Sequence, residues 1–258
     1  HGGKILMQIL HSGRYGYQPF VVSSSPIKSP ISMFKPRALS DKEIWSTISD
    51  FARCAKLAKY AGYDGVEIMG SEGYLINEFL AARTNLRDDQ WGADYARRMR
   101  FAVEVVRAVR ERAGSDFIIV YRLSMLDLVP DGSTHDEVVE LAREVEAAGA
   151  DIIKITATGG VLSNTAAGLN QQFSDAELAA IVETAHRMGR KVTAHAHGVD
   201  GINSFLRAGG DSIEHGTYLD EAAAKAMRDR GTVLIPTLMA FQGISERLGK
   251  GIYTPVVE

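Results

Sequence analysis

Short apolar runs alternate with longer amphipathic stretches along the chain. Several runs are apolar at consecutive positions, as strands of a parallel sheet are when both of their faces are covered. Strands that alternate with helices in this way predict repeated βα units. Seven runs have the length of such strands: 4–10, 65–69, 117–123, 151–155, 191–194, 212–214 and 232–237.

The intervening stretches carry helix signals. Ser40 with Glu43, and Ser174 with Glu177, fit the capping box, in which each side chain satisfies an orphan backbone N–H. Apolar residues then recur at helical spacing, in the two sets Val138, Leu141, Ala142, Val145 and Leu178, Ile181, Val182, Ala185. The segment 18–37 is rich in Ser and Pro and has neither periodicity, which predicts a long loop.

The length of the chain favours one fold class, and its composition excludes some classes of partner. A chain of 258 residues suits one TIM (β/α)8-type barrel, so we expect a single domain over 1–258 with about seven recognisable βα strands. The formal net charge of −3 and the lack of a long basic run predict neither a nucleic-acid nor a membrane partner. The lone Cys54 and the absence of a signal segment predict a cytoplasmic protein. The start at His1, directly before an apolar run, suggests a missing lead-in.

The first part of the chain resembles the flavin barrel of bacterial 2,4-dienoyl-CoA reductases in the old yellow enzyme family. The residues that carry the resemblance are 66–80, Arg83-Thr84-Asn85 and Trp91-Gly92. The resemblance implies FMN as cofactor, with Gln8 and Arg122 in contact with the flavin ring. It also implies a catalytic role for Tyr74, as proton donor to the substrate.

The second part resembles metal-dependent amidohydrolases of the Xaa-Pro dipeptidase type. The similar segments are 153–155, 157–160, 194–198 and 212–216. In that family the lysine is carboxylated and bridges two metals, and two histidines bind one of them, which implies Lys154, His195 and His215 as metal ligands. We therefore predict a chimera of an old yellow enzyme-like part, 1–150, and an amidohydrolase-like part, 151–258, joined between Glu146 and Ile153.

Neither parental site is expected to be complete. The amidohydrolase family also uses a His-x-His pair and an aspartate that we do not find, so zinc is expected to be held weakly, with a carboxylate such as Glu67 as a substitute ligand. The alternative is that His195, His197 and His215 are hydrogen-bonded histidines at the barrel mouth. A purely structural role explains a buried Lys154 less well, because burying an uncompensated charge costs several kcal/mol.

FMN is predicted to be absent. The strands that bind the cofactor's phosphate in the flavin family are not found, and backbone donors and cations at the phosphate supply much of the binding energy. The alternative for Gln8, Tyr74 and Arg122 is an internal polar network with Glu67 and Glu72.

The function expected first is therefore residual, amidohydrolase-like, metal-dependent hydrolysis of peptide or ester bonds in a small-molecule substrate, carried by a chimeric barrel without a complete site. The alternative is an FMN-dependent enoate (2,4-dienoyl-CoA) reductase, and a silent barrel is a third reading. Seven strands leave a TIM barrel open, so we also expect 5–10 and 233–238 to be apolar edge strands that promote self-association.

Overall fold

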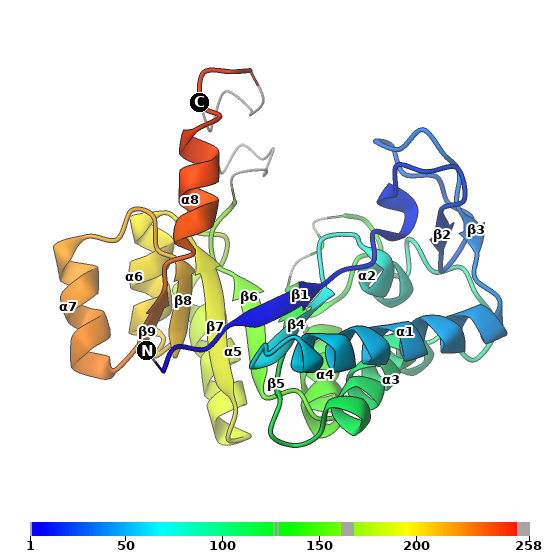
Figure 1. The fold of residues 1–258 in the computed structure, drawn as a ribbon, viewed down its shortest axis with the longest axis horizontal. Helices are drawn as coiled ribbons and strands as arrows, with labels where there is room; N and C mark the ends of the chain where they lie inside the picture. Colours follow the sequence, from blue (N-terminus) through cyan, green and yellow to red (C-terminus); the bar gives the residue numbers. More distant parts are fainter. Residues whose placement is uncertain (1, 126, 128, 161–167, 252–258) are drawn as a thin grey trace. The chain divides into compact units, whose positions relative to one another are not determined.

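The computed structural model describes residues 2–125, 127, 129–160 and 168–251 (Figure 1). The chain divides into two compact units, residues 1–153 and 154–258. Both units are built from parallel strands that alternate with helices, as the apolar pattern predicts. The division lies beside the predicted join at 146–153, although a boundary between compact units carries no information about ancestry. The single-domain description of 1–258 stays a prediction.

The first unit is built on three parallel strands in the order β1-β4-β5. Their bounds are Leu6–Ile9 for β1, Gly65–Gly70 for β4 and Ile118–Leu123 for β5. The helices are η1 (Gly13–Tyr15), α1 (Asp41–Tyr60), α2 (Leu75–Leu80), α3 (Tyr95–Ala113) and α4 (His135–Ala147). Helix α1 packs against α3 and β4, and α3 packs against β5.

The second unit continues the same alternation with strands in the order β6-β7-β8-β9. Strand β6 (Ile152–Thr156) spans the division, and it is followed by β7 (Lys191–Ala196), β8 (Ser212–His215) and β9 (Val233–Ile235). The helices are α5 (Asp175–Arg187), α6 (Val199–Arg207), α7 (Glu221–Arg230) and α8 (Leu238–Ser245). Strands β7, β8 and β9 pair in parallel.

All seven strands predicted from the sequence are present, each within a few residues of the predicted bounds. The capping boxes at Ser40 and Ser174 are confirmed, and Thr134 with Glu137 forms a third one that starts α4. The predicted loop 18–37 is corrected in one respect. It begins and ends in a short parallel pair, β2 (Val22–Ser23) with β3 (Arg37–Ala38), which has too few residues to show a period in the sequence.

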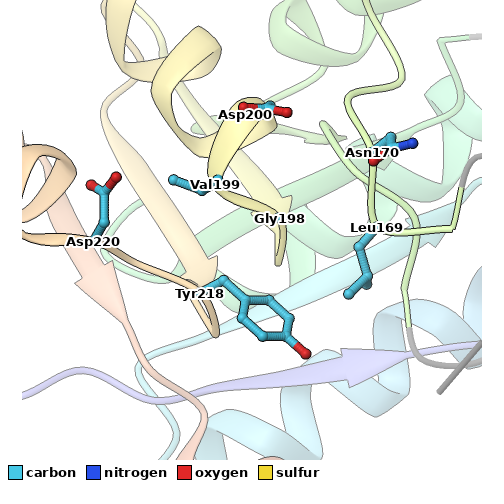
Figure 2. A pocket seen from close by; sticks show the side chains of 7 residues that line it. All are labelled: Leu169, Asn170, Gly198, Val199, Asp200, Tyr218 and Asp220. Atoms are coloured by element: carbon cyan, nitrogen blue, oxygen red, sulfur yellow. The ribbon is translucent and has the colours of Figure 1, made fainter. Parts of the chain in front are cut away.

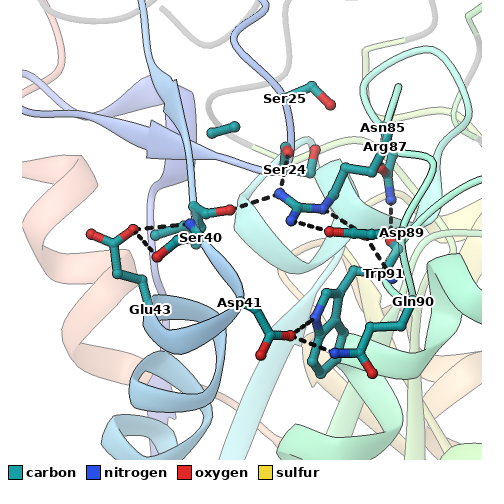
Figure 3. Close-up of polar contacts among 12 residues, drawn as sticks. Ser24, Ser25, Ser40, Asp41, Glu43, Asn85, Arg87, Asp89, Gln90 and Trp91 are labelled. Carbon is teal, nitrogen blue, oxygen red and sulfur yellow. Dashed lines mark hydrogen bonds and ion pairs between the residues drawn. The ribbon is translucent and has the colours of Figure 1, made fainter.

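The long loop is anchored by a polar network around Arg87 (Figure 3). The guanidinium donates to the carbonyl oxygens of Ser24 at 3.2 Å and Leu39 at 2.7 Å, and it forms an ion pair with Asp89 at 2.5 Å. These two carbonyls directly follow β2 and β3, so one side chain ties both ends of the loop to the segment that precedes α3. A planar cation with several donors is suited to that task.

The two faces of the β4–β5 pair differ in chemistry. Alternate residues on one face are apolar and fully buried: Val66, Ile68, Ile119 and Tyr121. The opposite face carries the charged side chains of Glu67 and Arg122, both buried. Because side chains alternate along a strand, this pattern places the polar groups of β4 and β5 on a common surface.

The exposure of the edge strands and the character of the helices relate to two predictions, self-association and a cytoplasmic location. Strand β9 is exposed along its length, including Val233 at 57 %, and Ile5 beside β1 is 61 % exposed. Self-association through these edges stays a prediction. Among the described residues, no helix combines the length and apolar character needed to span a bilayer. The cytoplasmic location also stays a prediction.

Candidate functional site

Gln8 and Arg122, the two predicted flavin contacts, lie on the polar face of the first unit. Gln8 is the register partner of Glu67, and its side-chain amide donates to the Glu67 carboxylate at 2.8 Å. Glu67 in turn pairs in register with Val120, two residues before Arg122. Since residues i and i+2 of a strand share a face, the amide and the guanidinium point to the same side of the sheet.

Tyr74, the predicted proton donor, follows β4 at the start of α2. The Arg122 guanidinium forms an ion pair with Glu72, two residues before Tyr74, and the Tyr74 ring packs edge-on against Tyr15 at 5.9 Å between centroids. Burial raises the pKa of the Tyr74 hydroxyl, the Glu72 charge raises it further, and the Arg122 charge opposes them. The phenol therefore keeps its proton at neutral pH.

A tight turn sets the position of Tyr74. Glu72 and Gly73 both have left-handed backbones, with φ of 64° and 76°. A Cβ atom at Gly73 would lie 2.6 Å from the Tyr15 hydroxyl, so the turn requires glycine for space as well as for conformation. The Gly73 N–H donates to the Asn77 side chain at 2.7 Å, which ties the turn to α2.

Glu78 is a buried carboxyl that the sequence reasoning missed. It is 1 % exposed, in a helix whose other residues are also buried, and its Oε1 accepts from the Arg14 N–H at 2.9 Å. Burial raises its pKa to about 7, against the opposing hydrogen bond from the Arg14 backbone. A Cβ at Gly13 would lie 2.3 Å from the same carboxylate, so Glu78 fixes the loop that follows β1. The available signal was a single Glu inside the apolar run 75–80.

Glu78 should make the stability of the protein fall as pH rises. A carboxyl whose folded pKa of about 7 exceeds its ordinary 4.5 binds more protons in the folded state between these values, so unfolding releases a proton there. Stability from this group is present below pH 4.5 and is lost as pH rises through 7. Relative to wild type, Glu78→Gln should gain about 3 kcal/mol between pH 4.5 and 8. Urea unfolding across that range tests this, with the exposed Glu111→Gln as control; parallel pH profiles for wild type and Glu78→Gln would contradict it.

Lys154, a predicted metal ligand, is 3 % exposed on β6 and forms an ion pair with Glu214 of β8. Glu214 is the register partner of His195, so the ion pair lies on the face of the sheet that carries His195. Sequence reasoning missed Glu214, although its place two strands from Lys154 was a usable signal. Whether Lys154 ligates a metal stays a prediction.

His195 and His215, the other predicted ligands, lie together with His197. The ring centroids are 4.6 Å apart for His195 with either neighbour and 4.7 Å apart for His197 with His215. One nitrogen from each ring can be chosen so that all three lie within 4.8 Å of one another. The hydrogen bonds expected for mouth histidines are also present, from Nδ1 of His197 to Thr217 at 2.7 Å and from Nδ1 of His215 to Thr237 at 2.6 Å.

A cavity of about 390 Å³ lies in the second unit (Figure 2). Gly198, which follows His197, forms part of its wall, and the Tyr218 N–H donates to the His197 carbonyl oxygen at 3.1 Å. The remaining lining residues are Leu169, Asn170, Val199, Asp200 and Asp220. The cavity thus adjoins the segments that follow β7 and β8, where parallel α/β folds place their ligands.

Comparison with known proteins identifies the family. The sequence profile of the NADH:flavin oxidoreductase / NADH oxidase family matches residues 1–192. The chain belongs to this family. The N,N-dimethylglycine/sarcosine dehydrogenase of Chromohalobacter salexigens is 38 % identical over 180 residues, which cover 67 % of this chain and 26 % of that protein. The NADH oxidase of Thermoanaerobacter brockii is 38 % identical over 164 residues, covering 61 % of this chain and 25 % of that protein.

The chain therefore spans about a quarter of the length of these relatives. Among solved structures, morphinone reductase superposes with a TM-score of 0.68 at 24 % identity, covering 82 % of this chain and 61 % of that one. This likeness shows the fold alone. The prediction of an α/β, TIM-type barrel is thereby confirmed, as is the resemblance of the first part to the old yellow enzyme family, whereas neither comparison supports the chimeric part of the fold prediction.

Two predictions are wrong. The hydrolase function is overturned because the flavin family's profile runs past the predicted join and includes Lys154, and the related proteins are oxidoreductases. The expectation that FMN is absent is overturned by the same match. The expectation rested on phosphate-binding strands that were not found in this sequence, and a chain that spans about a quarter of its relatives' length does not support that argument.

Proposed function

We propose that this chain supplies the ring-binding side of an FMN-dependent oxidoreductase that reduces an activated carbon–carbon double bond. Support comes from one arrangement: the Gln8 amide and the Arg122 guanidinium share a sheet face, and a protonated Tyr74 stands at the end of the strand between them. Together they provide two polar groups for a cofactor and one proton for a substrate.

The donor set fits the flavin ring. An amide can both donate to and accept from the pyrimidine edge, and a guanidinium stabilises negative charge that develops on the ring. Glu67 and Glu72 hold these two side chains in place through the contacts already described. When bound, FMN supplies the hydride for reduction of the double bond.

Tyr74 is proposed to donate the proton that completes the reduction. Its raised pKa keeps the hydroxyl protonated, and its edge-on contact with Tyr15 restricts the ring's orientation. A positioned acid of this kind is effective only within hydrogen-bond reach of the accepting carbon, which the turn at Glu72 and Gly73 would secure. The substrate class, an enoate or enoyl thioester, and the nicotinamide electron donor are proposals for the whole protein.

Arg122→Met is expected to weaken FMN binding by about ten- to a hundredfold, because hydrogen bonds to a charged group contribute about 1.5–3 kcal/mol. Titration of flavin fluorescence with the purified chain measures this. The exposed Arg112→Met, at the end of α3, is the matched control and should bind FMN as wild type does. Equal affinities for both variants, with wild-type folding, would remove Arg122 from the site.

We further propose that the part of the chain beyond the family match, after residue 192, descends from an amidohydrolase, without implying that hydrolysis survives. The match covers the predicted join at 146–153, so the proposed join lies beyond it. The proposal is supported by the histidine segments 194–198 and 212–216. Sequencing of the gene across the codons around residue 192, with comparison of its neighbouring reading frame, tests it. A reading frame that continues as a flavin-family barrel beyond 192 would end it.

A further inference from the structure

His215 has a backbone conformation that its place in the strand does not explain. Its φ is 73°, in the left-handed region that residues other than glycine rarely adopt. His195 pairs in register with Glu214, so regular alternation would send the side chain of the next residue, His215, to the opposite face. The His215 ring nevertheless lies 4.6 Å from the His195 ring, because the left-handed turn ends the strand and redirects the side chain.

The surroundings also orient the rings. Thr217 and Thr237 each hydrogen-bond the Nδ1 atom of one histidine, His197 and His215 respectively. Thr237 itself has a left-handed backbone with φ of 47°. A hydrogen-bond partner at one ring nitrogen orients the imidazole, as the outer partners of metal-binding histidines usually do. Residues with strained backbone conformations occur most often at functional sites, where the surrounding structure enforces the strain.

We propose that His195, His197 and His215 bind one divalent transition-metal ion of the Zn²⁺, Co²⁺ or Ni²⁺ class through three imidazole nitrogens. Imidazole ligands without thiolates favour these ions over Mg²⁺ or Ca²⁺. Three protein ligands leave one position of a tetrahedral ion open to water or another small ligand. The site goes beyond the flavin function and does not depend on it.

The geometry requires at least one ring to turn, because the His197 and His215 planes are stacked 10° apart and their in-plane lone pairs run nearly parallel. The three nitrogens lie within 4.8 Å of one another, whereas a tetrahedral ion with metal–nitrogen bonds of about 2.05 Å needs about 3.4 Å between them. Rotation about the side-chain bonds can supply that difference, since all three rings already lie against one another.

This ligand set differs from the one that the sequence resemblance implies. Lys154 is held in an ion pair with Glu214, and an ammonium group has no lone pair for a metal. His197, which the resemblance left out, takes the third position. A set of Lys154, His195 and His215 would need a carboxylated lysine, and therefore bicarbonate, whereas three histidines need neither.

The test uses the tag-free full chain titrated with CoCl₂. We expect one Co²⁺ per chain by equilibrium dialysis, with the intense visible bands of a four-coordinate cobalt site. His195→Ala, His197→Ala and His215→Ala should each abolish these bands. The control is His186→Ala, a half-exposed histidine of the same unit that pairs with Asp211, and it should bind Co²⁺ as wild type does. Absence of binding in wild type would overturn the proposal.

Two further variants distinguish the three-histidine set from the set that includes Lys154, and one of them keeps every proposed ligand in place. Lys154→Gln, shown to be folded by circular dichroism, should retain Co²⁺ with and without bicarbonate. Loss of binding in the folded variant, or retention in His197→Ala, would overturn the three-histidine set. Thr217→Val leaves all ligands in place and should weaken binding roughly 10–100-fold, as removal of an orienting partner does. Unchanged affinity in Thr217→Val, with Co²⁺ still raising the melting temperature, would show that Thr217 does not orient a ligand, and the three histidine variants alone would then decide the site.

Discussion

Replacing Tyr74 by phenylalanine is expected to slow reduction of an activated alkene by about 10²–10⁴-fold in the FMN-loaded protein, the usual contribution of a positioned general acid. FMN affinity should stay unchanged, because Gln8 and Arg122 rather than Tyr74 are proposed to contact the ring. The phenylalanine ring keeps the edge-on contact with Tyr15, so folding should also be preserved. Steady-state assays with an α,β-unsaturated substrate give the rate.

The matched control is Tyr60→Phe, which removes a hydroxyl at an 87 % exposed position and should leave the rate unaltered. The pH profile gives a second readout. Because burial and Glu72 raise the pKa of Tyr74, the wild-type rate should persist into the alkaline range and then decline as the phenol loses its proton. A phenylalanine ring has no such proton, so the same decline in Tyr74→Phe would assign it to another group and exclude Tyr74 as the acid.

The strands could be predicted from sequence because each is a local pattern. An apolar run bounded by turn residues specifies a buried strand whatever its partners are. The capping boxes at Ser40 and Ser174 were readable for the same reason, since both partners lie within one turn. The short pair β2–β3 was not readable, because two residues on each side show no period and their pairing joins positions far apart in sequence.

The candidate sites were predictable in composition but not in arrangement. Gln8 and Glu67 are register partners on neighbouring strands, whereas Arg122 contacts Glu72 in the turn that follows β4, and both contacts join segments about 50 or more residues apart. The turn of His215 toward His195 was not foreseeable. It depends on a left-handed φ at a residue other than glycine, which no propensity favours.

The error over FMN had a different origin. The prediction gave most weight to phosphate contacts that were not found in the sequence, whereas the family match covers most of the chain and favours FMN binding. The Lys154 interpretation failed to include Glu214 because the charge of a buried lysine was considered alone. A buried cation in a fold is evidence for a nearby anion before it is evidence for a metal.

Lys154→Met is expected to destabilise the second unit by about 3–5 kcal/mol, the usual effect of removing one partner from a buried ion pair. Lys154 is 3 % exposed, and the substitution keeps the volume of the side chain while removing the ammonium partner of Glu214. Urea unfolding followed by circular dichroism gives the change. Lys59→Met is the matched control: its pair with Asp116 is largely exposed, so the substitution should have little effect on stability.

The double variant Lys154→Met with Glu214→Leu then decides what the ion pair contributes. Replacing both charges by apolar groups removes the attraction together with the cost of burying the charges, so the double variant should recover most of the stability that Lys154→Met loses. The recovery would show that the loss in the single variant comes from the isolated Glu214 charge rather than from packing. If the double variant is instead less stable than either single variant, the two side chains act independently. Contacts other than the one with Glu214 would then stabilise the buried Lys154 side chain, and the ion pair would no longer explain why a lysine is buried in β6.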